Sequence, residues 1–103
     1  MSITTHVLDT STGRPAAGVP VRLDRAGQTL HSGRTDDDGR WSVLSDQALE
    51  PGDHTLVFAT DGYFGGMSFH PEVAVTFRVT GGEPHLHVPL LLSPFGYTTY
   101  RGS

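Results

Sequence analysis

Short runs of β-branched and apolar residues, separated at short intervals by Gly, Pro and Asp, dominate this 103-residue chain. Such runs and breaks are typical of strands and turns, and no segment keeps the 3.6-residue apolar period of an amphipathic helix. Strands are predicted at 3–9, 19–25, 29–35, 41–44, 54–60, 73–79, 85–92 and 97–101, with short helical candidates only at 46–49 and 63–67. Many short strands at this spacing predict one all-β domain over residues 1–103, a sandwich or barrel.

Composition excludes several classes of function. The chain has no cysteine, which excludes disulfides, a thiolate nucleophile and thiolate zinc, and favours a cytoplasmic location. It has no run of 18 apolar residues and no hydrophobic segment behind a basic start, so neither a membrane span nor a secretory signal is predicted. The net charge of -4 argues against nucleic acid or an anionic membrane as a partner.

Charge is unevenly distributed along the chain. Seven of the eleven acids lie in its middle: Asp36, Asp37, Asp38, Asp46, Glu50, Asp53 and Asp61. Residues 84–103 carry no acid, but they hold His85, His87 and Arg101. All seven basic residues are Arg, whose planar guanidinium groups suit a small anion.

Side-chain alternation sorts the strands that carry histidines into a core face and an outer face. In HLHVPLLL, Leu86, Val88, Leu90 and Leu92 alternate with His85, His87, Pro89 and Leu91; in ITTHVLD, Ile3, Thr5 and Val7 alternate with Thr4, His6 and Leu8. The aliphatic sets are predicted to face the core, so His85 and His87 lie on an outer face, about 7 Å apart along their strand. Because Leu8, Pro89 and Leu91 share the outer side, it is predicted to contact another subunit.

Seven side chains are candidates for chemistry on that side: His6, Arg40, His85, His87, Tyr100, Arg101 and Ser103. Histidines with pKa values near neutrality take a proton from water and return it to a leaving group. Arginines hold an anion and stabilise charge that develops on a carbonyl oxygen. Each residue taken singly also has a structural explanation, but together they suit hydrolysis of an activated cyclic amide without a metal.

The same imidazoles allow a second chemistry. An H-x-H pair on a strand with a third His is an arrangement that holds catalytic zinc. However, no carboxylate lies near His85 and His87 in sequence to orient their rings. Zinc is therefore kept as the alternative to a metal-free site.

The remaining residues of note are assigned structural places. His31 and His54 are predicted to lie on the surface, and Trp41, Phe58, Phe77 and Val79 in the core. The glycines of DGYFGGM lack a strand before them and a helix after them, so a phosphate loop is not predicted.

Three blocks, ITTHVLDTSTGRPAAGVPVRL, DDDGR and HLHVPLLLSPFGYTTYRGS, together resemble the 5-hydroxyisourate hydrolases, the enzyme branch of the transthyretin family. The resemblance runs from end to end. It implies a transthyretin-like antiparallel sandwich of about eight strands in two sheets, assembled as a homotetramer with active sites in the channel between dimers. The implied reaction is hydrolysis of 5-hydroxyisourate, the product of urate oxidation, to 2-oxo-4-hydroxy-4-carboxy-5-ureidoimidazoline in purine catabolism.

The resemblance also implies roles for single residues. His6, Arg40, His87 and Ser103 are the catalytic candidates, and His85, Tyr100, Arg101 and Gly102 the substrate-binding ones; no metal or other cofactor is implied. Gly65 and Gly66 stand where this family has a short helix, and glycine costs about 1 kcal/mol there relative to alanine. The alternative is a non-catalytic transthyretin-type module that binds a small ligand; such carriers lack the first-strand His and have small residues where Tyr100 stands.

Overall fold

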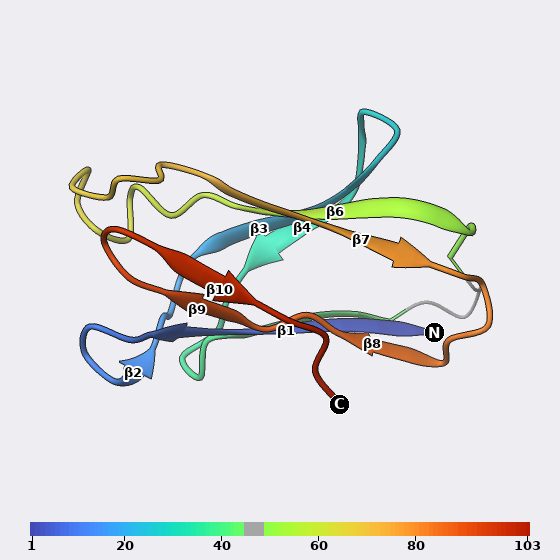
Figure 1. Cartoon of the computed structure of the whole chain (residues 1–103), viewed down its shortest axis with the longest axis horizontal. Coiled ribbons are helices and arrows are strands. Elements are labelled where there is room, and N and C mark those ends of the chain that lie inside the picture. Colours follow the sequence, from blue (N-terminus) through green and yellow to red (C-terminus); the bar gives the residue numbers. More distant parts are fainter. Residues whose placement is uncertain (45–48) are drawn as a thin grey trace.

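The computed structural model describes residues 1–44 and 49–103 as two β-sheets packed face to face (Figure 1). Its strands are β1 Ser2–Asp9, β2 Arg14–Pro15, β3 Pro20–Arg25, β4 Gln28–Arg34, β5 Arg40–Leu44, β6 Gly52–Phe58, β7 Val73–Val79, β8 His85–His87, β9 Leu90–Leu92 and β10 Tyr97–Thr99. The predicted sandwich is therefore confirmed.

Strand β1 is the centre of the first sheet. Its first half lies between β5, which is antiparallel to it, and β8, which is parallel. Its second half lies between β2 and β9, and β10 pairs with the outer edge of β9. The second sheet is antiparallel throughout, in the order β4-β3-β6-β7.

The expected strand at 85–92 differs from the observed structure in one detail. It is divided into β8 and β9, with Pro89, which has no N–H to donate to a ladder, in the gap. Both parts pair in parallel with β1, whereas the sequence indicated only antiparallel strands.

The core lies between the sheets, where the alternation placed it. Ile3 and Val7 of β1 are buried, as are Leu86, Leu90 and Leu92, which approach them from the parallel neighbours. Full burial of one such side chain is worth about 1.5–3 kcal/mol. This row of aliphatic contacts fixes which face of β1 and β8 is left for chemistry.

One surface assignment from sequence is wrong. His54 was expected at the surface, but it is only 1% exposed on β6, with its ring stacked on Phe77 at a centroid distance of 6.2 Å. The reason is the strand period, which puts His54 on the same face as Leu56 and Phe58. Of the predicted core residues, Phe58 and Val79 are buried.

Trp41 and Phe77, also predicted in the core, are partly buried and pack against it. His31 is exposed, as expected.

No helix occurs among the described residues, and so none there has the length and hydropathy needed to cross a bilayer. The helical candidate at 63–67 lies in a series of turns, in which Gly65 and Gly66 have φ angles of 64° and 81°. These left-handed values are incompatible with a right-handed helix. Most of the other candidate, 46–49, lies outside the described residues.

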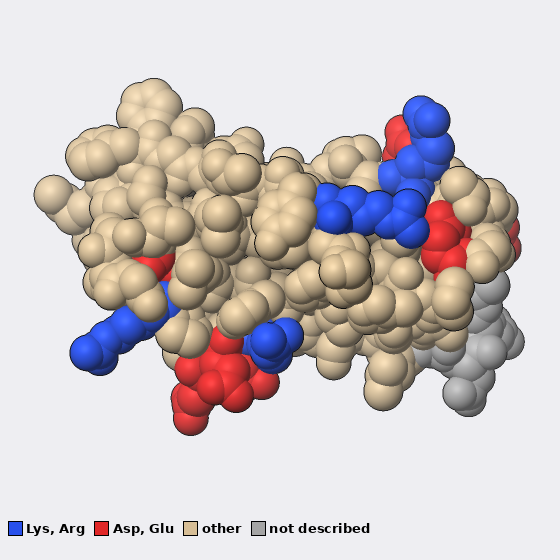
Figure 2. All heavy atoms as spheres, turned by 60° about the horizontal axis from the view of Figure 1, so that its bottom comes forward, with Lys and Arg blue, Asp and Glu red and all other residues tan. Residues whose placement is uncertain are grey.

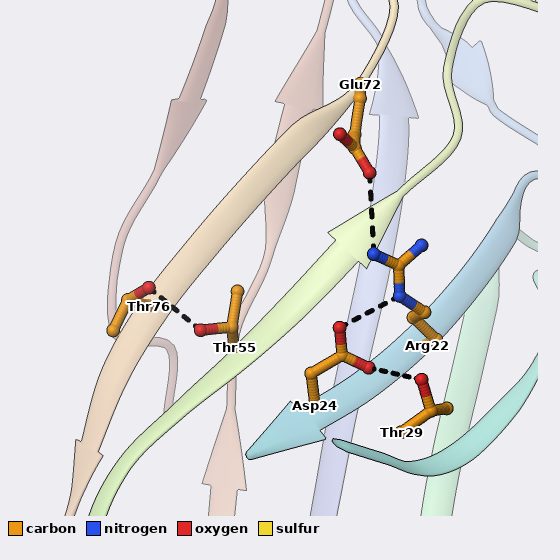
Figure 3. Close-up of polar contacts among 6 residues, drawn as sticks. All are labelled: Arg22, Asp24, Thr29, Thr55, Glu72 and Thr76. Atoms are coloured by element: carbon orange, nitrogen blue, oxygen red, sulfur yellow. Dashed lines mark hydrogen bonds and ion pairs between the residues drawn. The ribbon is translucent and has the colours of Figure 1, made fainter. Parts of the chain in front are cut away.

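The outer face of the second sheet is polar, and its side chains form hydrogen bonds and ion pairs with one another. Figure 3 shows its contacts, which join Arg22 to Asp24 and Glu72, Thr29 to Asp24, and Thr55 to Thr76. The Arg22–Asp24 pair spans 2.9 Å and the Arg22–Glu72 pair 3.6 Å. Exposed pairs of this kind add little stability, so this face is suited to solvent.

Gly39 closes the turn that leads into β5, with φ at +75°, and its carbonyl accepts the Val7 N–H at 2.7 Å. A Cβ at this position would lie 2.4 Å from the Val7 carbonyl oxygen. Gly39→Ala is expected to lower the free energy of unfolding by about 2–4 kcal/mol, from left-handed strain and overpacking together. Urea denaturation measures it, with Gly82→Ala, where a Cβ meets nothing within 4 Å, as the matched control. Equal midpoints for the two variants would contradict the prediction.

Candidate active site

Strand register brings distant residues together on the outer face of the first sheet. His6 of β1 lies opposite Arg40 of β5, and on the other side of β1 Ser2 and Thr4 lie opposite His85 and His87 of β8. Residues that are opposite one another project from the same face. His6, Arg40, His85 and His87 therefore share one face, as the alternation predicted for the three histidines.

A hollow of about 450 Å³ opens on this face. Four of the predicted site residues line it, namely Arg40, His85, His87 and Ser103, together with Thr4 and Ser42. Its volume lies within the range of small-molecule sites, about 300–1,000 Å³. His6 is not part of the lining, but it stands opposite Arg40 and is near enough for its charge to affect His87.

Two hydroxyl groups hold the paired imidazoles. Thr4 Oγ1 lies 2.7 Å from His87 Nδ1, and Ser2 Oγ lies 2.5 Å from His85 Nδ1. The two rings stack with centroids 6.4 Å apart and planes 12° apart. The orientation of both rings is thus set by β1 rather than left to solvent.

Burial lowers the pKa of the His87 imidazole below its ordinary value of 6.5. A backbone hydrogen bond with Thr4 raises this pKa, while the nearby charges of His85, Arg40 and His6 lower it. The net direction is down, so His87 is neutral at pH 7 and able to accept a proton.

The Asp36 side chain fixes the start of β5. Asp36 Oδ1 accepts the backbone N–H groups of Asp38, at 2.9 Å, and of Arg40, at 3.0 Å. Within the part of the chain that the structure describes, the Arg40 guanidinium forms no ion pair. It is thus held by its backbone and free to meet an anion.

The end of the chain is joined to His87. The Gly102 N–H donates to the His87 carbonyl oxygen at 2.9 Å, an isolated bridge that carries Ser103 into the hollow. Tyr100 and Arg101 line a neighbouring hollow of about 320 Å³, against Phe77 and Arg78 of β7. His87 lines both hollows. Within one chain, therefore, the last four residues lie on both sides of His87 rather than in one pocket.

The family model described as HIUase/Transthyretin family matches residues 3–102. The chain belongs to this family. It is 44% identical to the 5-hydroxyisourate hydrolase of Salmonella dublin, over 98% of this chain and 80% of that protein. It is also 44% identical to the Mus musculus 5-hydroxyisourate hydrolase, over 98% and 94% of the two chains.

Solved structures of the HIUase/Transthyretin family have the same fold. The Klebsiella pneumoniae 5-hydroxyisourate hydrolase superposes with a TM-score of 0.90 at 40% identity, covering 99% of this chain and 98% of that one. Transthyretin from Sparus aurata superposes with a TM-score of 0.83 at 28% identity, covering 97% and 95%. The higher identities lie with the hydrolases, as the quoted sequence blocks implied.

Thr4 is a functional candidate that the sequence did not reveal. It was placed on the face of His6 by the same alternation, but a threonine in a strand carries no chemical signal of its own. The signal lay in the combination of that alternation with the register of β1 against β8, and register is not visible in one sequence.

A zinc ligand set is not found among residues 1–44 and 49–103, where no group of three His, Cys, Asp or Glu side chains is placed to hold a metal ion. The ring nitrogens of His85 and His87 that face β1 are instead engaged by hydroxyl groups.

Proposed function

We infer that this chain hydrolyses 5-hydroxyisourate to 2-oxo-4-hydroxy-4-carboxy-5-ureidoimidazoline, a step of urate degradation. The observation that carries this function is the convergence of Arg40, His87 and Ser103 on one small hollow, in a chain that resembles named 5-hydroxyisourate hydrolases along its whole length. A relative from Arabidopsis thaliana, 46% identical over 98% of this chain, is named a uric acid degradation bifunctional protein.

The proposed mechanism uses a neutral imidazole and a guanidinium group. One histidine, His6 or His87, takes a proton from water as the water oxygen attacks the ring carbonyl; the C–N bond then breaks, and the other histidine gives a proton to the departing nitrogen. Arg40 holds the anionic ring and stabilises the charge that develops on the carbonyl oxygen. Arg101 in the neighbouring hollow is a second anion contact, and His85, Tyr100, Gly102 and Ser103 line or support the site.

A direct assay tests this function. 5-Hydroxyisourate is generated in situ with a urate oxidase, and the disappearance of its ultraviolet absorbance is followed with and without the protein. Faster disappearance supports the enzyme, whereas the spontaneous rate would leave the non-catalytic, ligand-binding transthyretin-type module as the better proposal. Loss of activity with a chelator, restored by zinc, would support the metal alternative.

The acid limb of the kcat/KM profile is expected to have its midpoint below pH 6.5, the ordinary pKa of histidine. A general base must be unprotonated, so activity is full above its pKa and falls as the pH drops through it. Burial lowers the pKa of His87 and therefore moves this limb to lower pH. The rate, corrected for spontaneous decay at each pH, measures it, and a midpoint above pH 6.5 would count against His87 as the base.

The site is proposed to lie at the interface between dimers of a homotetramer. Leu8 and Leu91 on the outer face are only half-buried, and Tyr100 is 56% exposed in the single chain. Much of the surface in Figure 2 is free of Lys, Arg, Asp and Glu, and the arginines and acids lie beside one another in a few small groups, which leaves uncharged surface for contact with another copy. Light scattering after gel filtration tests the assembly, since a monomeric mass with full activity would contradict it. The cytoplasmic location stays a prediction.

A further inference from the structure

We propose that Thr4 is a positioning residue that holds His87 as the general base, with Nδ1 protonated and Nε2 left to accept the proton of water; this rests on the proposed hydrolysis. Sequence reasoning left open whether His6 or His87 is the base. The hydrogen bonds on β1 distinguish the two, because only one of these rings is held by a described neighbour.

The contact is made by the strands themselves. Thr4 and His87 are paired residues of the parallel β1–β8 ladder, and Thr4 Oγ1 lies 2.7 Å from His87 Nδ1. Threonine is β-branched and stiff about χ1, so the hydroxyl is held against the ring. By contrast, no residue in the described part of the chain hydrogen-bonds the His6 imidazole, although it faces the same side.

The proposed direction of the hydrogen bond fits the other contacts along the row. Thr4 Oγ1 also lies 3.4 Å from His85 Nε2, and His85 Nδ1 lies 2.5 Å from Ser2 Oγ. A hydroxyl has one proton to donate. If His87 Nδ1–H donates to Thr4, the Thr4 proton is free for His85 Nε2, and His85 Nδ1–H donates to Ser2. The other three ring nitrogens of the two histidines then each have a partner, and His87 Nε2 keeps its lone pair.

The Thr4 carbonyl oxygen accepts the Val88 N–H at 2.8 Å, so the hydroxyl is the Thr4 group that positions the His87 ring. In the proposed tautomer, the ring nitrogen that faces this hydroxyl carries the hydrogen. With Nδ1 protonated in a neutral imidazole, Nε2 is the basic atom.

A neutral hydroxyl has a different effect from the carboxylate that commonly orients a histidine. A carboxylate partner favours the imidazolium ion and raises the histidine pKa, whereas a hydroxyl orients the ring without charging it. The titratable groups around His87 are His6 of β1, Arg40 of β5, Asp36 of the preceding turn, His85 of β8, Arg78 of β7, and Tyr100 and Arg101 near the chain end. Most of them are or become cations, so a neutral base is the state that this surrounding favours.

Two substitutions of Thr4 test the role of the hydroxyl. Thr4→Val keeps the shape and β-branching but removes the oxygen, and kcat is expected to fall by about 10-fold or more, because proton transfer at a correctly held base is worth 10²–10⁴-fold. Thr4→Ser keeps the hydroxyl and is expected to retain kcat within about 3-fold of the parent. Thr10→Val, which removes a hydroxyl bonded to the Leu92 carbonyl at the far end of β1, is the matched control.

A second readout separates positioning from general damage. ¹⁵N NMR of the His87 ring is expected to show Nδ1 protonated and Nε2 unprotonated in the parent and in Thr4→Ser, and a mixture of tautomers in Thr4→Val. Equal activity of Thr4→Val and the parent, or equal losses in Thr4→Val and Thr4→Ser, would overturn the proposal. A parent protein that fails to hydrolyse 5-hydroxyisourate would overturn the proposed function alone, because the tautomer of His87 still reports on Thr4.

Discussion

His87→Ala is expected to lower kcat/KM for 5-hydroxyisourate by about 10²–10⁴-fold, the range for loss of a general base. His87 lines both hollows on the site face, and burial lowers the pKa of its ring so that the ring is neutral near pH 7. Alanine removes the basic nitrogen and leaves the strand intact, because the backbone groups of His87 that bond Gly102 stay in place. Steady-state rates in the urate oxidase coupled assay measure the loss.

The control for His87→Ala is His31→Ala, an exposed histidine of β4 on the other sheet, which is expected to keep full activity. His6→Ala serves as the comparison within the site. If His6 is the acid that protonates the leaving nitrogen, its loss also lowers kcat/KM, while loss of His87 removes the acid limb of the pH profile. Parent-like turnover in His87→Ala would exclude this residue from the chemistry.

The face of each histidine strand was predictable from sequence because a strand has a period of two. Leu86, Leu90 and Leu92 had to face the core, so His85 and His87 could not, and the structure agrees. The same rule predicts the burial of His54, which was instead assigned to the surface by its polarity. In a short strand whose other alternate residues are Leu56 and Phe58, the period is the stronger signal.

Register was the part that one sequence could not supply. The pairing of His6 with Arg40 and of Thr4 with His87 depends on how far β5 and β8 slide along β1, and a slip of one residue would reverse the faces. Each strand contains the same residues in every register, so its composition does not reveal which residues lie opposite one another. The resemblance to the hydrolase family selected His6, Arg40 and His87 as a set, but the hydroxyl row beside them needed coordinates.

The parallel pairing of β1 with β8 and β9 was missed for a related reason. Alternation reports which face is buried but not the direction of a neighbour, and a run of residues broken only by Pro89 looks like one strand of a hairpin. The parallel arrangement matters for the site, since it sets Ser2, Thr4 and His6 in order along the β8 histidines.

Gly102→Ala is expected to lower kcat/KM by about 10-fold or more with little loss of stability. The added methyl group would push the His87 imidazole out of its position as the base. A Cβ at residue 102 would lie 2.4 Å from His87 Cδ2 and 3.1 Å from Pro89 Cγ, so the imidazole must turn away from Thr4 or the bridge to the His87 carbonyl must open. Gly96→Ala in the preceding turn, where a Cβ meets only Ser93 Oγ at 3.9 Å, is the matched control and is expected to keep its activity.

The catalytic rates and the urea denaturation midpoints of the Gly102→Ala and Gly96→Ala variants are compared. Equal rates would mean that the last residues pack beside the base without setting its position, and a large shift in midpoint for Gly102→Ala alone would place their role in folding instead.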